Sequence, residues 1–275
     1  MAKQQNTEDF FERTAKLFGS DAILIPGGSN FRNKTLNNIM MNRLIPILTN
    51  YEKKSFLEIG SGIGRWSKII SQKNLVTGVD VSRYMVQEAK KSINNEQCFF
   101  IVADACNLPF KDDAFEVVIS ITVLQHILDQ TRLVKAISEI SRCSQNNIII
   151  VEEMWSEATF NLDAVHYPIR ISSTSFYIRE VTSQGYKVKS LKGLTFAPLA
   201  ILLVKFFVYL SQFIPISFKG KLENPKKPTF GARVINLALA CSLIPDLVYS
   251  RLDPQKNFNS HLSLHTLIHF KKHQK

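Results

Sequence analysis

Short apolar runs alternate with amphipathic stretches over the first two thirds of the chain. The apolar runs, rich in β-branched and aromatic residues, lie at Ser55–Ile59, Leu75–Val79, Cys98–Val102, Phe115–Ile121 and Ile148–Val151. The stretches between them space their apolar side chains as helices do and lie at Trp66–Ser71, Ser82–Ile93 and Thr131–Cys143. This alternation predicts an α/β fold in which helices cover both faces of a mostly parallel sheet.

Further elements are expected toward both ends of the chain. An amphipathic run at Leu36–Leu48 predicts a helix within an N-terminal helical cap of residues 1–50. Gly185–Leu191 and the tail His261–Lys272 alternate at period two, which predicts two more strands. We expect residues 1–275 to form a single domain.

Two apolar blocks separate these last two strands and predict a helical insertion or lid over about residues 194–255. They lie at Phe196–Ile216 and Val234–Ile244. Pro198, Lys205 and Pro215 interrupt the first block. The helix between the prolines would be about 22 Å long, short of the roughly 30 Å hydrocarbon core of a bilayer. A membrane-spanning helix is therefore not expected.

The net charge of +11 lies entirely in the last third of the chain. Residues 1–185 hold 20 of the 34 Lys and Arg residues and 20 of the 23 Asp and Glu residues, so they are neutral. Residues 196–250 are basic and apolar. We expect them to roof an acceptor pocket or to meet an anionic membrane surface through basic residues, namely Lys219, Lys221, Lys226 and Lys227. Nucleic acid is disfavoured as a partner, because surfaces that track phosphates are not usually interleaved with runs such as AILLV.

The cysteines and the N-terminus favour a reducing compartment. The four cysteines are widely spaced, without a CxxC pair, and are Cys98, Cys106, Cys143 and Cys241. The N-terminal sequence is polar and lacks the apolar core of a signal peptide. We expect a cytoplasmic protein, associated with the cytoplasmic face of a membrane if the basic segment serves that purpose.

A glycine-rich loop is the strongest functional signal. The apolar run that ends at Ile59 leads into Gly60, Gly62 and Gly64, and a predicted helix follows. Glycines let the chain turn sharply and let a ligand approach the backbone, and the helix that follows favours an anionic group. The dinucleotide fingerprint G-x-G-x-x-G would need a third glycine where Arg65 stands. The spacing is instead G-x-G-x-G.

Acidic residues accompany three successive predicted strands. Glu58 precedes the loop, Asp80 ends the second strand 20 residues after Gly60, and Asp104 follows the third strand. A carboxylate at Asp80 can accept both hydroxyls of a ribose. Asp104 can accept from an exocyclic amine, with the N–H of Ala105 near a ring nitrogen. A lone Asp at a strand end usually caps a turn, but three in succession favour a nucleoside site.

These stretches resemble the class I S-adenosylmethionine-dependent methyltransferases, in the type 11/25-like branch that methylates small-molecule and lipid-like acceptors. The resemblance covers about residues 50–155 and rests on LEIGSGIGRWS, VTGVDVSRYMVQEAKK, ADACNLPFKDDAFEVVIS and ITVLQHILD. It implies a Rossmann-like three-layer sandwich. Its seven-stranded sheet would be mostly parallel, with an antiparallel last strand that follows the helical insertion.

The resemblance also implies a cofactor, S-adenosylmethionine, a product, S-adenosylhomocysteine, and a set of binding residues. These are Glu58, Gly60, Ser61, Gly62, Gly64, Asp80, Val81, Met85, Asp104, Ala105, Ile121 and Gln125. The glycines would wrap the methionine part and Glu58 would support its ammonium. Val81 and Met85 would flank the adenine, and Ile121 and Gln125 would border the sulfonium.

Methyl transfer to a hydroxyl acceptor is helped by a base. His126, directly after the fourth strand, is one candidate, although a structural histidine that bonds a loop is the competing interpretation. Glu152 and Glu153 end the fifth strand, and adjacent strand residues point to opposite faces, so at most one can face the pocket. Glu152 is our candidate of the two. Later residues that could line an acceptor site are His166, Tyr167, Arg170 and Tyr177.

Several chemistries are disfavoured by the sequence. The fourth strand is followed by Thr122-Val123, not by the Asn/Asp-Pro-Pro-aromatic loop of enzymes that methylate exocyclic amines, and no Pro-Cys dipeptide occurs. Histidines recur every fourth residue at His261, His265, His269 and His273. On the predicted strand they would be about 13 Å apart, too far to share an ion. We expect no metal site.

The predicted function is methyl transfer from S-adenosylmethionine to a small-molecule or lipid-linked acceptor. The alternative is a catalytically idle protein of the same fold that binds a membrane surface or a partner. A nicotinamide oxidoreductase is disfavoured by Arg65 and Asp104. The sequence identifies neither the acceptor atom nor the oligomeric state.

Overall fold

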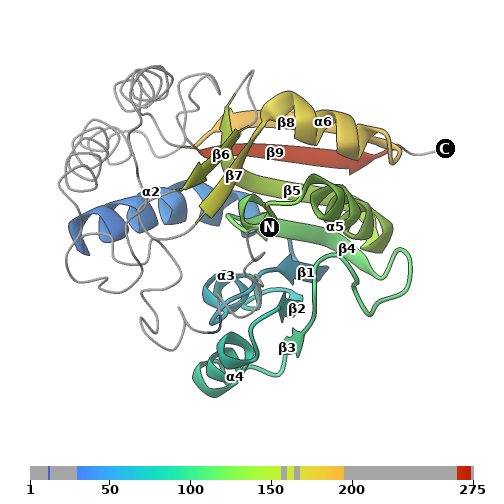
Figure 1. The fold of residues 1–275 in the computed structure, drawn as a ribbon. Helices are drawn as coiled ribbons and strands as arrows, with labels where there is room; N and C mark the ends of the chain where they lie inside the picture. The colour runs from blue at the N-terminus through green and yellow to red at the C-terminus, as the bar shows by residue number, and fades with distance from the viewer. Residues whose placement is uncertain (1–11, 13–29, 156–159, 164–167, 195–264, 274–275) are drawn as a thin grey trace.

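A computed structural model of the chain describes residues 12, 30–155, 160–163, 168–194 and 265–273. Its centre is a main sheet with the order β3-β2-β1-β4-β5-β9-β8 (Figure 1). The strands are β1 (Ser55–Ile59), β2 (Leu75–Asp80), β3 (Cys98–Val102), β4 (Phe115–Ile121), β5 (Ser144–Trp155), β8 (Tyr186–Gly193) and β9 (His265–Lys272). Only β9 is antiparallel to its neighbours, β5 and β8. The expected mostly parallel sheet with an antiparallel last strand is confirmed.

Two additional strands leave the main sheet at the end of β5. They are β6 (Phe160–Asp163) and β7 (Pro168–Ser173), which pair antiparallel with each other. The last two residues of β7 pair in parallel with Met154 and Trp155. The sequence analysis did not predict this pair, because both strands are short and β7 begins with a proline.

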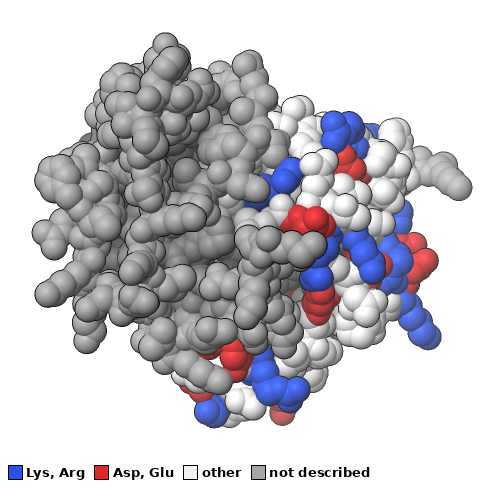
Figure 2. Space-filling model, viewed as in Figure 1, with Lys and Arg blue, Asp and Glu red and all other residues white. Residues whose placement is uncertain are grey.

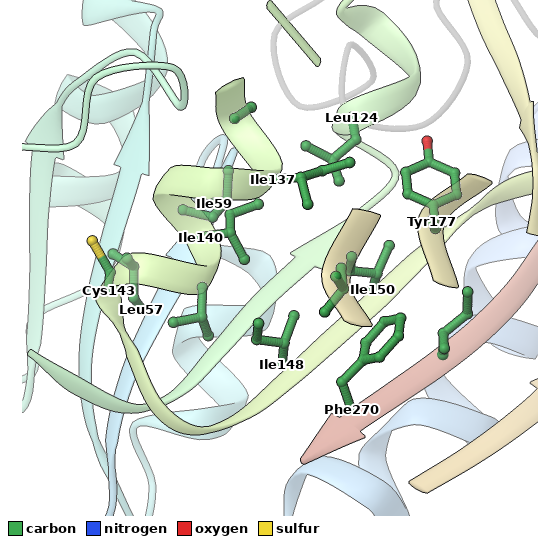
Figure 3. Packing of buried hydrophobic residues seen from close by; sticks show 14 of the residues in the cluster. Leu57, Ile59, Leu124, Ile137, Ile140, Cys143, Ile148, Ile150, Tyr177 and Phe270 are labelled. Atoms are coloured by element: carbon green, nitrogen blue, oxygen red, sulfur yellow. The ribbon is translucent and has the colours of Figure 1, made fainter. Parts of the chain in front are cut away.

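Helices cover both faces of the main sheet, as expected for a three-layer sandwich. They are α2 (Asn30–Leu48), α3 (Arg65–Ile70), α4 (Arg83–Ser92), α5 (Gln130–Cys143) and α6 (Thr174–Thr182), with a 3-10 turn η2 (Leu124–His126) after β4. One core cluster joins the sheet to α5 and α6, and the other joins it to α2, α3 and α4. Figure 3 shows the first cluster, in which Ile148, Ile150 and Phe270 of the sheet meet Ile137 and Ile140 of α5.

Hydrogen bonds at the helix starts explain where three helices begin. The side chains of Ser82, Asp129 and Ser173 each accept a hydrogen bond from the backbone N–H three residues further along the chain. This bond stabilises the first turn of the helix. The predicted helices at Trp66–Ser71, Ser82–Ile93 and Thr131–Cys143 are confirmed to within one residue at either end.

Two predicted elements are longer in the structure than in the sequence analysis. The helix expected from Leu36 begins at Asn30. The strand expected at Ile148–Val151 extends over Ser144–Trp155, because its polar ends still pair with β4 on one side and β9 on the other. Backbone pairing thus lengthens a strand beyond its apolar residues.

Part of the predicted organisation lies outside the described residues. This holds for the cap before α2 apart from Glu12, for the insertion from residue 195 onward and for His261. The single-domain organisation therefore stays a prediction. Among the described helices, none combines the length and apolarity needed to cross a bilayer.

Acidic and basic side chains intermingle on the described surface. Figure 2 shows Lys and Arg beside Asp and Glu across the described part of one face. Ion pairs account for part of this pattern, for example Arg142 with Asp112 at 2.8 Å. The balance agrees with the neutral composition of residues 1–185.

Candidate functional site

The carboxyl edge of the parallel strands brings the predicted cofactor residues together. The glycine loop follows β1, Asp80 ends β2, Asp104 follows β3 and the turn η2 follows β4. These four strands are neighbours in the order β3-β2-β1-β4. In an open parallel sheet, the carboxyl ends of the strands line the crevice in which ligands bind.

The glycine loop has three residues in the left-handed region of φ, which glycine adopts without strain. The φ angles of Gly60, Gly62 and Gly64 are 66°, 54° and 82°. A Cβ on Gly60 would lie 2.3 Å from Val123, whereas a Cβ on Gly62 would meet none of the described residues within 4 Å. The backbone is therefore packed at Gly60 and open to a ligand at Gly62.

Ser61 has a second feature that is typical of a ligand-binding loop. Its backbone N–H donates to the carbonyl of Val79 at 2.9 Å, which fixes the loop to β2. Its Oγ is buried and has no hydrogen-bond partner among the described residues. A buried hydroxyl of this kind is stabilised when a ligand supplies the missing bond.

Asp80 is held in place by backbone donors. Its Oδ2 accepts the N–H of Gly62 at 2.8 Å, and its Oδ1 accepts the N–H of Ser82 at 2.9 Å. Burial raises the pKa of this carboxyl above its ordinary value, and the two backbone bonds oppose the shift. Since a carboxylate has about four acceptor positions, both oxygens keep capacity for the hydroxyls of a ribose.

Glu12 joins this site from the N-terminal segment, which the sequence analysis did not anticipate. Its Oε2 accepts the hydroxyl of Ser82 at 2.7 Å and the N–H of Tyr84 at 3.2 Å, at the start of α4. Its charge also raises the pKa of Asp80. No local motif marks Glu12, because its contact depends on a partner 70 residues away.

Glu58 is buried below the glycine loop. It accepts a hydrogen bond from the hydroxyl of Ser67 on α3. Burial raises the pKa of Glu58 to about 8, and the bond from Ser67 and the charge of Arg65 only partly oppose this. A cation bound next to Glu58 would stabilise its ionised form.

Arg65, which stands where a dinucleotide fingerprint has its third glycine, has a structural use here. Its Nη1 donates to Asn37 Oδ1 of α2 at 2.6 Å, and its guanidinium lies 4.6 Å from the ring of Trp66. Burial lowers the pKa of Arg65 to about 10. The residue links α2 to the start of α3 beside the loop.

Asp104 is paired at the far end of this edge. Its Oδ1 accepts the N–H of Cys106 at 2.9 Å, and its Oδ2 accepts from Arg132 of α5 at 2.7 Å. An adenine amine at Asp104 would share the carboxylate with Arg132. Of the residues predicted to flank the adenine, Met85 is buried, and Val81 and Ala105 are half-buried.

Glu152 holds the loop after β4. It accepts the N–H groups of Val123, Leu124 and Gln125 at 2.9, 2.8 and 3.3 Å and the hydroxyl of Ser120 at 3.3 Å. Burial raises the pKa of Glu152 to about 7 against these bonds. Its oxygens are directed at the backbone around η2, which supports a positioning role for Glu152. Its role as a base stays a prediction.

His126, at the end of η2, has the surroundings expected of a structural histidine. Burial lowers its pKa to about 4, although a hydrogen bond with the backbone of Thr122 opposes the shift. The imidazole is therefore neutral at pH 7. The neutral ring and its hydrogen bond with the backbone of Thr122 favour the structural role.

The end of β5 brings another pair together. Glu153 lies opposite His265 in the antiparallel register of β5 and β9, with Oε1 3.6 Å from Nε2. The backbone N–H of Glu153 donates to Gln125 Oε1 at 3.2 Å. Gln125 and Ile121 are buried at this edge, where the sequence analysis placed the sulfonium.

The proposed acceptor residues are only partly described. His166 and Tyr167 lie outside the described residues. Arg170 donates to the carbonyl of Leu128 at 3.3 Å and to Gln130 Oε1 at 3.1 Å, which fastens β7 to the start of α5. Tyr177 is fully buried in the first core cluster (Figure 3). No group of three or more metal-binding side chains occurs within the described ranges.

Comparison with known proteins adds independent information. A family profile described as "Methyltransferase domain" matches residues 57–151. The human protein "Probable tRNA methyltransferase 9B" is 38% identical over 85 residues, which are 31% of this chain and 18% of that protein. The chain spans less than a third of the human, mouse and cattle proteins of that name.

Two solved structures share the fold at low identity. Magnesium protoporphyrin IX methyltransferase from Synechocystis PCC 6803, solved with bound S-adenosylmethionine, has a TM-score of 0.53 and 18% identity, covering 68% of this chain and 88% of that one. The [4+2]-cyclase SpnF has a TM-score of 0.52 and 16% identity, covering 84% and 80%. A cyclase among the structural neighbours means that the fold alone does not define the reaction.

Proposed function

The chain carries a class I S-adenosylmethionine-dependent methyltransferase domain, and we propose that it transfers the cofactor's methyl group to a small-molecule or lipid-linked acceptor. The observation that carries the proposal is the open backbone at Gly62, joined by a hydrogen bond to the anchored carboxylate of Asp80. S-adenosylhomocysteine is the expected product.

The residues at the carboxyl edge fit the chemical groups of this cofactor. Gly62 leaves room beside the backbone, and the buried Oγ of Ser61 has bonding capacity to spare among the described residues. Glu58 offers a buried acidic group to an ammonium. When bound, the cofactor supplies a methyl group on a cationic sulfonium, which is already a good leaving group.

The task left to the protein is alignment. Asp80 orients the ribose, and the loop held by Glu152 places Gln125 at the end of β4. Alignment of the two reacting groups lowers the entropic part of the barrier. An idle protein would have no need of these features, which disfavours the alternative of a binding module.

Titration calorimetry with S-adenosylmethionine and S-adenosylhomocysteine tests cofactor binding. We expect Asp80→Ala to weaken binding of both by about 10- to 100-fold, since charge-assisted hydrogen bonds contribute about 1.5–3 kcal/mol. Asp112→Ala is the matched control, because Asp112 is exposed and pairs with Arg142. Absence of binding to the wild type, or equal binding by Asp80→Ala, would contradict the proposal.

The loop after β4 supports the proposed acceptor class. Thr122 and Val123 replace the Pro-Pro loop of enzymes that methylate exocyclic amines, which supports a small or lipid-linked acceptor. An RNA acceptor is the second candidate, since the local identity to a protein named as a tRNA methyltransferase is 38%. Transfer of tritiated methyl groups to a cellular lipid extract and to total tRNA, assayed separately, distinguishes the two. We expect label in the lipid extract only.

Residues 196–250 are proposed to dock on an anionic membrane on the cytoplasmic side. Their support is sequence composition, since they lie outside the described residues. Flotation with vesicles of anionic phospholipid tests the proposal. The wild type is compared with a variant in which four lysines are changed to Glu, namely Lys219, Lys221, Lys226 and Lys227. Wild-type protein should float with the vesicles and the variant should not. Equal recovery of both in the soluble fraction would reject it.

A further inference from the structure

The order of the strands divides the carboxyl edge between two ligands. Asp104, Asp80 and the glycine loop occupy the ends of β3, β2 and β1, and η2 follows β4. The proposed cofactor would lie along these carboxyl ends. The next strands in the main sheet are β5, which presents its carboxyl end at this edge, and the antiparallel β9, which presents its first residues. Neighbouring strands are about 4.8 Å apart, so these two ends border the sulfonium and are the place for an acceptor.

Two acidic residues lie near the end of β5, and their surroundings differ. Glu152 points to the α5 side and accepts four hydrogen bonds from residues 120–125. Glu153 points to the opposite face, as alternation along a strand requires. Its backbone bonds to the side chain of Gln125, so it is adjacent to the loop that borders the sulfonium.

The carboxylate of Glu153 is both oriented and accessible. Its Oε1 lies 3.6 Å from His265 Nε2, while its side chain keeps 22% of its surface exposed. The histidine is 5% exposed and sits directly opposite in the register. The buried imidazole therefore lies beside one oxygen of Glu153, and the exposed part of the carboxyl group can reach a substrate.

We propose that Glu153 is the general base for a hydroxyl acceptor, such as a phenol or an alcohol, and that His265 positions it. The inference deepens the proposed function and rests on it. In the step, the acceptor oxygen forms the new O–C bond and its proton passes to the free oxygen of Glu153. The S–C bond breaks with its electron pair going to sulfur, and Glu153 later returns the proton to water.

A labelled-methyl assay on a panel of phenols and long-chain alcohols tests the role of Glu153. The wild type should methylate at least one member of the panel at oxygen. Glu153→Gln should lower kcat by about 100-fold or more, in the range attributed to general base catalysis. Its affinity for S-adenosylhomocysteine should stay within about twofold of wild type. Asp112→Ala is the matched control and should keep full activity.

Chemical rescue separates a base from a merely structural carboxylate. Added formate should restore part of the activity of Glu153→Ala, because a small carboxylate can enter the space of the missing side chain. The role of His265 is tested with two substitutions. Gln at this position retains an N–H donor near the position of Nε2, whereas Leu has no donor. His265→Gln should therefore retain most of kcat, and His265→Leu should lose it without a change in cofactor affinity.

The outcomes distinguish this inference from the proposed function. If S-adenosylhomocysteine does not bind the wild type, the proposed function fails. If it binds, but no hydroxyl in the panel is methylated, the inference is overturned and the proposed function stands. Full activity of Glu153→Gln, or no rescue of Glu153→Ala by formate, would also overturn it.

Discussion

Glu58 is the residue whose charge we expect to depend most directly on a bound cofactor. Its pKa is raised to about 8 by burial, so it is mostly protonated at pH 7 when the site holds no cation. A bound ammonium stabilises the carboxylate and lowers this pKa. Binding at pH 7 therefore releases a proton from the protein.

Calorimetry in buffers with different ionisation enthalpies measures this proton. We predict release of about one proton when S-adenosylmethionine binds at pH 7, where the amino group of the cofactor is mostly protonated and Glu58 is mostly not ionised. Glu58→Gln should bind more weakly and release none. Glu139→Gln is a control, since that carboxyl is paired with Arg142. Proton uptake by the wild type would contradict this account.

At the scale of elements, the glycine loop serves both the fold and the ligand. Gly60 is closely packed against Val123, while Gly62 faces open space. The sequence predicted the loop but not this division, because the spacing G-x-G-x-G gives both residues the same appearance. The close approach of Val123, which precedes η2, to Gly60 sets the difference.

Alanine substitutions distinguish the effect of the loop glycines on stability from their effect on ligand binding. Gly62→Ala and Gly185→Ala both place Cβ in open space at a positive φ, so each should cost about 1–2 kcal/mol of unfolding free energy. Gly60→Ala should cost more, because its Cβ would lie 2.3 Å from Val123. Among the matched pair, Gly62→Ala alone should weaken binding of S-adenosylhomocysteine. Equal binding by Gly62→Ala and Gly185→Ala would contradict the proposal that the ligand contacts the backbone at Gly62.

The turn η2 depends on Glu152. Replacing this carboxylate by Gln turns an amide donor toward the N–H groups of the loop, so Glu152→Gln should lower the unfolding free energy by about 2–4 kcal/mol. Glu52→Gln is the control, since Glu52 is exposed and its pair with Lys73 should contribute less than about 1 kcal/mol. Urea denaturation measures both. A loss as small as that of Glu52→Gln would rule out the positioning role.

At the scale of the whole molecule, buried titratable groups set the pH dependence of stability. Burial raises the pKa of Glu58 to about 8 and that of Glu152 to about 7. Their stabilisation is present below the ordinary carboxyl pKa and is lost as pH rises through these values. Burial lowers the pKa of His126 and His269 to about 4. Their stabilisation is present above the ordinary histidine pKa and is lost as pH falls toward 4.

The cofactor-free protein should therefore be most stable between about pH 5 and 6.5. Above this range the unfolding free energy should fall by about 1.4 kcal/mol per pH unit for each of these carboxyls that is still protonated in the folded protein but ionised in the unfolded chain. Glu58→Gln should flatten the fall between pH 7 and 8. Thermal denaturation across this range measures the curve, and stability that rises from pH 6.5 to 8 would contradict it.

The sequence predicted most of the sheet and missed the connections made across it. The starts and ends of β1, β3 and β4 were predicted because their apolar runs are bounded by polar residues. The pair of Glu153 and His265 was not predicted, since it depends on the register between two strands far apart in the chain. The contact of Glu12 with Ser82 is of the same kind.

A crystal structure of the protein with S-adenosylhomocysteine would test the central claim most directly. We predict that the ribose hydroxyls lie within hydrogen-bond distance of Asp80 and that the ligand passes over Gly62. Its amino group should lie on the side of Glu58, and its sulfur should lie beside the end of β4. A ligand bound away from the carboxyl edge, or one that makes no contact with Asp80, would contradict the account.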